Sequence, residues 1–247
     1  MATPGHAPTI LMLWSTPRSR STAFFRMMCE RGDYQVLHEP FSYLAEFGAT
    51  EVGEMTVRSE ADLLTALRGL AAGKPLFVKD TTDERYPGVL GDPQFLADEA
   101  CHSFLIRHPV ETIASYYAIN PEVKLHQIGF ETQLELFRAV REATGRKPIV
   151  IDAKDLVTHP GEVVKAYCAR AGIPFLPAAL HWRPVSRKEW APSERWHREV
   201  SKSSGFQSGP SSSTATALEV ADHAVLGSYL RHHLPFYEEM LAERLEV

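Results

Sequence analysis

Short apolar runs alternate with amphipathic stretches along roughly the first 180 residues. The apolar runs lie at residues 9–14, 75–79, 103–106 and 149–151, and each is typical of a strand buried on both faces of a sheet. Apolar residues at helical spacing predict helices within 21–28, 63–71, 109–117, 130–140 and 160–172. Because strands that alternate with helices favour a parallel sheet, we predict a three-layer α/β fold with a mostly parallel central sheet and helices on both faces.

The pattern changes after about residue 180. Three tryptophans fall in a charged stretch, and residues 201–216 are too rich in Ser, Gly and Thr to form core. This segment predicts a flexible loop, and two helical patterns follow it, at 217–232 and 235–245. Since no repeat or linker interrupts the earlier part of the chain, we expect a single domain over residues 1–247.

Composition and charge exclude several classes of function. The chain has 247 residues, of which 44% are hydrophobic, and a formal net charge of -5, so it lacks the basic surface that nucleic-acid binding requires. Its three cysteines form no CxxC pair, and no Cys/His cluster has metal-ligand spacing, so we expect reduced thiols and no metal. The first residues do not resemble a signal peptide, and no apolar stretch reaches membrane-spanning length. We therefore expect a cytoplasmic protein without a membrane partner.

Residues 16–22 form a polar loop between the first predicted strand and the first predicted helix. A helix N-terminus attracts anions because its backbone N–H groups are unpaired and its dipole end is positive. Ser19, Ser21 and Thr22 add hydroxyl donors, and Arg18 adds a planar guanidinium suited to phosphate or sulfate oxygens. The loop lacks the G-x-x-x-x-G-K-[ST] pattern of nucleotide triphosphatases, which indicates a donor that needs no metal. The alternative is an ordinary helix start with surface arginines.

A second candidate anion anchor follows the third predicted strand. Arg107 ends that strand, and Ser115 lies on the helix after it. In a parallel sheet, ligands collect at the carboxyl ends of the strands, so these two side chains are expected to meet one phosphate. The alternative is structural, with Arg107 paired to Glu111 and Ser115 bonded to a backbone carbonyl.

Together these segments resemble the sulfotransferases that use 3′-phosphoadenosine-5′-phosphosulfate (PAPS), in particular a bacterial small-molecule branch. The resemblance rests on PRSRST at 17–22, HEPF at 38–41, VKD at 78–80, RHPVETIASYY at 107–117, WH at 196–197 and SSGF at 203–206. It implies a P-loop NTPase-like sulfotransferase fold, PAPS as donor, adenosine 3′,5′-bisphosphate as product and a small-molecule acceptor.

The resemblance also implies which residues bind the donor. It assigns the 5′-phosphosulfate to Arg18, Ser19, Ser21 and Thr22, the 3′-phosphate to Arg107 and Ser115, and further nucleotide contacts to Ser203, Ser204, Gly205 and Phe206. Arg20 belongs to the same loop but stands where the family usually has Gly. A left-handed backbone would be strained at an arginine, so the role of Arg20 in donor binding stays open.

Sulfuryl transfer requires a base, positive charge around the transferred group and a stabilised leaving phosphate. Arg18 and Lys79 are our candidates for the positive charge. Some family members place a His directly after the strand lysine, but Asp80 occupies that position here. Other bacterial members, which this chain resembles more closely, use a Glu before an aromatic segment. We therefore expect Glu39 to be the base, with His38 as the alternative.

Two other functions compete with this interpretation. A metal-dependent small-molecule or nucleotide kinase would need a lysine-bearing phosphate loop and Mg²⁺ ligands, and the sequence has no such loop. A non-catalytic nucleotide-binding module would need no base, whereas Arg18, Lys79 and Glu39 are all present. The flexible loop at 201–216 is predicted to act as a lid over the donor. The acceptor and the oligomeric state are not predicted.

Overall fold

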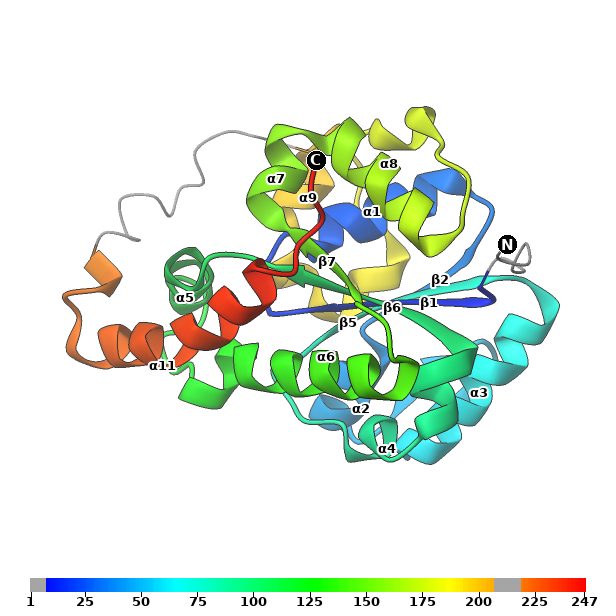
Figure 1. Cartoon of the computed structure of the whole chain (residues 1–247), viewed down its shortest axis with the longest axis horizontal. Helices are drawn as coiled ribbons and strands as arrows, with labels where there is room; N and C mark the ends of the chain where they lie inside the picture. Colours follow the sequence, from blue (N-terminus) through cyan, green and yellow to red (C-terminus); the bar gives the residue numbers. More distant parts are fainter. Residues whose placement is uncertain (1–7, 207–218) are drawn as a thin grey trace.

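Five parallel strands form the central sheet of the computed structural model, which describes residues 8–206 and 219–247 (Figure 1). Their order across the sheet is β2-β5-β1-β6-β7. A separate two-stranded antiparallel sheet, a hairpin, lies outside it. The strands are β1 (Ile10–Ser15), β2 (Gln35–His38), β5 (Leu76–Thr81), β6 (Ala100–Ile106) and β7 (Ile149–Asp152), and the hairpin consists of β3 (Thr50–Val52) and β4 (Met55–Val57).

Helices cover both faces of this sheet, as Figure 1 shows. One layer contains α1 (Ser21–Arg31), α7 (Ala153–Thr158), α8 (Pro160–Ala171) and α9 (Arg198–Lys202). The opposite layer contains α2 (Pro40–Phe47), α3 (Glu60–Gly73), α4 (Pro87–Leu90) and α6 (Phe130–Thr144), and α5 (Pro109–Tyr117) and α11 (Ala224–Leu241) flank the sheet. Short helical turns join these elements at η1 (Phe95–Glu99), η2 (Leu125–Ile128), η3 (Pro177–Leu180) and η4 (Lys188–Trp196).

The central strand explains why both faces are covered. Ile10, Met12 and Trp14 of β1 point into one hydrophobic core, whereas Leu11 and Leu13 point into the other. Successive side chains of a strand alternate between faces, so a run that is apolar at every position must be buried on both. The predicted three-layer α/β fold is confirmed, and each of the four predicted strands is present within three residues of its expected ends.

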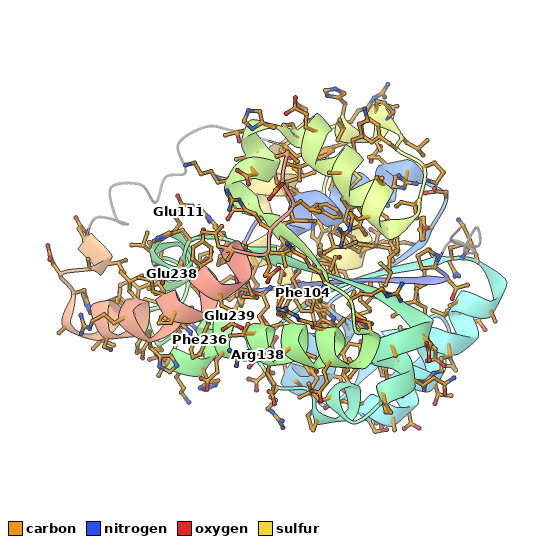
Figure 2. The ribbon with its side chains drawn as sticks, in the orientation of Figure 1. Phe104, Glu111, Arg138, Phe236, Glu238 and Glu239 are labelled. Atoms are coloured by element: carbon orange, nitrogen blue, oxygen red, sulfur yellow. The ribbon has the colours of Figure 1, made fainter. Side chains whose placement is uncertain are left out.

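The structure corrects the predicted C-terminal helices. We expected two segments separated before Pro235, but α11 runs without interruption from Ala224 to Leu241 and contains this proline. A proline inside a helix removes one backbone hydrogen bond. The buried side chains of His233, Tyr237 and Met240 on either side of it keep the helix packed on the core. Arg138 of α6 and Glu239 of α11 also form a two-point ion pair, with N–O distances of 2.6 and 3.0 Å (Figure 2).

Two further segments differ from the expectation. Strand β2 and helix α2, which together carry the HEPF segment, were not predicted from the apolar pattern. The loop expected at 201–216 starts with the last residues of α9, and Gly205 forms a β-bridge with His181. Residues 207–218, which include most of the predicted lid, lie outside the described part of the chain. Within the described part, no helix is both long and apolar enough to cross a membrane.

Candidate active site

The loop between β1 and α1 has a strained backbone that prepares an anion-binding helix end. Arg18 and Arg20 both adopt left-handed conformations, with φ angles of 63° and 68°. Ser19 is fully buried and its Oγ donates to the Thr16 carbonyl at 2.6 Å, which closes the turn. Arg20 occupies the N-cap position of α1 but its side chain does not cap the helix. Arg20 therefore keeps the left-handed backbone for which a glycine would be suited, at a cost of about 1–2 kcal/mol.

The two predicted anion anchors meet in space. Arg18 donates from Nε to Ser115 Oγ at 3.1 Å, and Arg107 donates from Nη1 to the Arg18 carbonyl at 2.9 Å. Arg107, which is 5% exposed, also pairs through Nε with Glu111 at 2.7 Å, so the structural alternative for this arginine is present as well. Two guanidinium groups thus lie beside the N-terminus of α1, where they can hold phosphate or sulfate oxygens.

Trp196 joins this cluster from the late part of the chain. Its carbonyl accepts from Arg18 Nη1 at 2.6 Å, and its ring lies 5.9 Å from the Arg18 guanidinium and 4.9 Å from that of Arg195. The Tyr116 ring meets it edge-on at 5.2 Å. The sequence indicated Trp196 only as part of a WH motif, because its neighbours come from α5 and the first loop.

A buried ion pair lies at the carboxyl ends of β2 and β5. Lys79 of β5 donates to Oε1 of Glu39, and these side chains are 2% and 11% exposed. Glu39 follows β2 and occupies the N-cap position of α2, where it adopts a left-handed backbone with a φ of 52°. Asp80, which the sequence placed beside Lys79, instead accepts from the Phe41 and Ser42 backbone N–H groups at 2.7 and 3.1 Å. Asp80 therefore caps α2 and holds Glu39 in place.

A chain of five hydrogen-bonded side chains connects this ion pair to the first loop. Thr22 Oγ1 lies 3.0 Å from His197 Nδ1, and His197 Nε2 lies 3.0 Å from Ser193 Oγ. Ser193 Oγ lies 2.7 Å from Tyr43 Oη, which in turn lies 3.0 Å from His38 Nδ1. All of these residues are buried except Thr22, which is half-buried. Sequence reasoning did not predict this role for Tyr43, Ser193 or His197, because the hydrogen bonds join three distant segments.

Burial keeps both imidazoles of this chain neutral. It lowers the pKa of His38 well below its usual value, and the nearby charge of Lys79 lowers it further. It also lowers the pKa of His197 to about 3. The pKa of the Tyr43 hydroxyl is raised, mainly by burial and then by the negative charge of Glu39. Each of these three groups therefore keeps its neutral form near pH 7, and each both donates and accepts.

Ligand atoms of His38, Glu39 and His197 lie within 4.8 Å of one another, close enough to hold a metal ion. The Lys79 ammonium already binds the Glu39 carboxylate, however, and would repel a divalent cation at this place. We therefore keep the expectation that the reaction uses no metal.

The remaining predicted nucleotide contacts lie in a different environment. Ser203 is buried, and its Oγ donates to the Val200 carbonyl at 2.8 Å and accepts from Trp182 Nε1 at 3.0 Å. The Ser204 carbonyl accepts from the Trp182 backbone N–H, and the Phe206 ring packs on Trp182 at 5.5 Å. These contacts anchor the SSGF segment to residues 181–182.

Comparison with known proteins identifies the family. The sulfotransferase domain family matches residues 9–244. Two Arabidopsis thaliana proteins, named branched-chain-amino-acid aminotransferase-like proteins 2 and 1, are 30% and 27% identical over 211 and 212 residues. Each alignment covers 81% of this chain but only 36% and 37% of the respective relative. The chain therefore spans little more than a third of the length of these relatives.

A solved structure shares the fold at low sequence identity, and a second one is reported beside it. The sulfotransferase domain of the Synechococcus PCC 7002 olefin synthase is 16% identical, with a TM-score of 0.51 over 88% of this chain and 95% of that one. The sulfotransferase from Alicyclobacillus acidocaldarius is 15% identical, with a TM-score of 0.49 over 81% of this chain and 98% of that one. At such identity, a likeness concerns the fold alone.

Proposed function

Because this chain belongs to the sulfotransferase family, whose domain matches residues 9–244, we propose that it transfers the sulfuryl group of PAPS to a hydroxyl or amine of a small acceptor. The observation that carries the proposal is the convergence of Arg18, Arg107 and Ser115 at the N-terminus of α1. One anionic group at a helix end is common, but two guanidiniums from the loops after β1 and β6, together with a hydroxyl of α5, suit a ligand with two anionic groups.

In this proposal the donor binds in one orientation. The 5′-phosphosulfate would lie against the first turn of α1, where the backbone N–H groups, Ser21 and Thr22 face it. The 3′-phosphate would be held by Arg107 and Ser115. Arg18, hydrogen-bonded to Ser115, lies between the two groups. Because its charge does not titrate near neutral pH, Arg18 would stabilise the leaving 5′-phosphate without acting as an acid.

Glu39 is the base in this proposal. Its carboxylate would take the proton of the acceptor while the acceptor oxygen or nitrogen bonds to sulfur and the bond from sulfur to the 5′-phosphate oxygen breaks. Glu39 is the better candidate because 11% of its side chain is exposed, whereas none of the His38 side chain is. Lys79 holds one carboxylate oxygen and leaves the other for the acceptor.

The two alternative functions, a kinase and a non-catalytic binding module, would each need different residues at this site. The first loop has no lysine to hold a triphosphate, and a module without chemistry would have no use for a carboxylate paired with a buried lysine. The aminotransferase named in the Arabidopsis relatives is not part of the proposal, since this chain covers so little of their length.

Release of adenosine 3′,5′-bisphosphate from PAPS in a mixture of small hydroxyl and amine compounds tests the proposal. We expect release that depends on enzyme and acceptor and persists in EDTA, since no step uses a metal. Calorimetry should show adenosine 3′,5′-bisphosphate binding more tightly than adenosine 5′-phosphate by about 2–4 kcal/mol, because the missing 3′-phosphate leaves Arg107 and Ser115 without their ligand. Arg107→Gln should abolish this difference, and Arg138→Gln on the surface of α6 serves as its control.

Dependence of turnover on Mg²⁺ would instead favour the kinase. Nucleotide binding without release, across acceptors, would favour the binding module.

A further inference from the structure

The series of hydrogen-bonded side chains from Thr22 to His38 begins with a hydroxyl group and ends with an imidazole ring. At one end, the Thr22 hydroxyl lies in the first turn of α1, beside the proposed 5′-phosphosulfate. At the other end, Nε2 of His38 is buried without a hydrogen-bond partner in the described part of the protein. The other ring nitrogen, Nδ1, faces both Tyr43 Oη at 3.0 Å and Glu39 Oε2 at 3.7 Å. His38 therefore joins the chain to the proposed base.

The number of protons limits how this chain can be arranged. With both imidazoles neutral, each of its five groups has one proton to donate, and four hydrogen bonds have to be filled. One of the five groups must therefore donate its proton to an acceptor outside this series of side chains, or leave that proton without an acceptor. His197 cannot be that group, because both of its nitrogens are in the chain and a neutral imidazole always carries a proton on one of them.

An anionic donor selects one of the remaining arrangements. Phosphate and sulfuryl oxygens only accept hydrogen bonds, so Thr22 must direct its proton to them and can then only accept from His197. His197 must carry its proton on Nδ1 and accept at Nε2 from Ser193. Ser193 in turn accepts from Tyr43, and Tyr43 accepts from His38. Every proton position is then determined, and the His38 proton lies on Nδ1.

We propose that donor binding at Thr22 sets the tautomer of His38, through Tyr43, Ser193 and His197, so that a protonated ring nitrogen and not a lone pair lies near the free oxygen of Glu39. The inference rests on the proposed function and adds to it a positioning role for four residues. Without the donor, Thr22 can donate to His197, and the opposite arrangement places the His38 lone pair toward the Glu39 carboxylate, which repels it. Lys79 holds the Glu39 carboxylate in both arrangements, and the repulsion from the His38 lone pair is removed only after the donor has bound.

Nuclear magnetic resonance of protein labelled with ¹⁵N-histidine measures these tautomers directly. The probe is adenosine 3′,5′-bisphosphate at saturation, with binding verified by calorimetry, and His38 and His197 are assigned by their Gln variants. We expect both residues to be protonated on Nδ1 in the complex. A His38 signal from the Nε2–H tautomer in the wild-type complex would overturn the proposal.

Two isosteric variants separate the relay from a merely structural network. Thr22→Val removes the hydroxyl that is proposed to donate to the bound nucleotide. Both histidines should then be mixtures of two tautomers even when nucleotide is bound. Tyr43→Phe removes the hydroxyl that links Ser193 to His38. His197 should then remain protonated on Nδ1, whereas His38 should not. If either variant left His38 as it is in the wild type, the relay would be wrong.

Kinetics provide an independent measure. Tyr43→Phe should lower kcat about tenfold with little change in the KM for PAPS, because a misplaced base affects the transition state more than donor binding. Tyr229→Phe, which removes a hydroxyl on α11 that bonds to Val123, is the matched control. An unchanged kcat in Tyr43→Phe would contradict the relay, whereas failure of the nucleotide to bind at all would contradict the proposed function.

Discussion

At the scale of single residues, Glu39 combines several features expected of a catalytic base. It has a left-handed backbone, a buried lysine on one carboxylate oxygen and a histidine near the other. A non-glycine residue with positive φ persists only where the surrounding structure supports its cost. Here Asp80 and Lys79, which are neighbours on β5, provide that support through the helix end and the carboxylate. Such strain at the proposed base agrees with a residue held for function.

Replacing the proposed base should therefore affect turnover and not donor binding. We expect Glu39→Gln to lower kcat by about 10²- to 10⁴-fold, the usual contribution of general base catalysis, with unchanged affinity for adenosine 3′,5′-bisphosphate. His38→Gln should have a smaller effect on kcat. Steady-state kinetics and calorimetry measure the two quantities, and Glu46→Gln on the exposed side of α2 is the control. If His38→Gln had the larger defect, the base would be His38.

At the scale of elements, strand ends and helix starts together make the site. Strand β5 ends in Lys79, Asp80 and Thr81, and its register places Lys79 beside His38 of β2. Parallel strands end at the same edge of a sheet, so residues 38 and 79 become neighbours although 41 positions separate them. The N-termini of α1 and α2 then lie at this edge, one available to the donor and the other capped by Asp80.

The cap of α2 should contribute both stability and activity. Asp80→Ala leaves three buried backbone N–H groups without their acceptor, at Phe41, Ser42 and Thr81, so we expect a loss of about 2–4 kcal/mol in the free energy of unfolding. Asp80→Asn should cost less, because its side-chain oxygen still accepts two of the three bonds. Urea unfolding measures both variants. An Asp80→Ala protein as stable as the wild type would show that α2 needs no cap.

At the scale of the whole molecule, buried neutral histidines make stability depend on pH. Burial lowers the pKa of His102 to about 4 and that of His233 to about 4, besides its effect on His197. His102 lies far from the site in the sheet core, where it accepts from Trp14 Nε1 through Nδ1 and donates to the Phe95 carbonyl through Nε2. Both ring nitrogens of His102 are therefore already hydrogen-bonded in a buried site, and a second proton on the ring would be neither hydrated nor accepted by a neighbour.

Acid should therefore destabilise the folded protein, because its buried neutral histidines must take up protons and become charged. For a histidine whose folded pKa is lowered, stability is complete above the unfolded pKa of about 6.5 and is lost as pH falls toward the folded value near 4. His102 alone should account for a loss on the order of 3 kcal/mol over that range. Unfolding midpoints between pH 7.5 and 4.5 measure it. His102→Gln should flatten this pH dependence and His126→Gln, on the surface, should not; equal slopes in the two variants would contradict the assignment.

The amino-acid sequence by itself determined the three-layer fold and the residue types of both anion anchors. Runs apolar at every position require burial on both faces, and Arg18, Arg107 and Ser115 follow such runs at the ends where parallel strands bind ligands. The family resemblance then supplied Glu39 and Lys79. The fold inference succeeds because it depends on local periodicity, which can be read along the chain. The roles of the site residues stay predictions, which rest on the positions of strand ends and on the resemblance.

Only the tertiary structure decided how these residues act together. Strand β2 is short and half-buried, so its pattern carries little signal, yet it brings His38 beside Lys79. The contacts of Thr22 with His197 and of Ser193 with Tyr43 join residues 175 and 150 positions apart. No local pattern encodes such pairs, because a hydrogen bond between distant segments exists only after the sheet and both helical layers have packed.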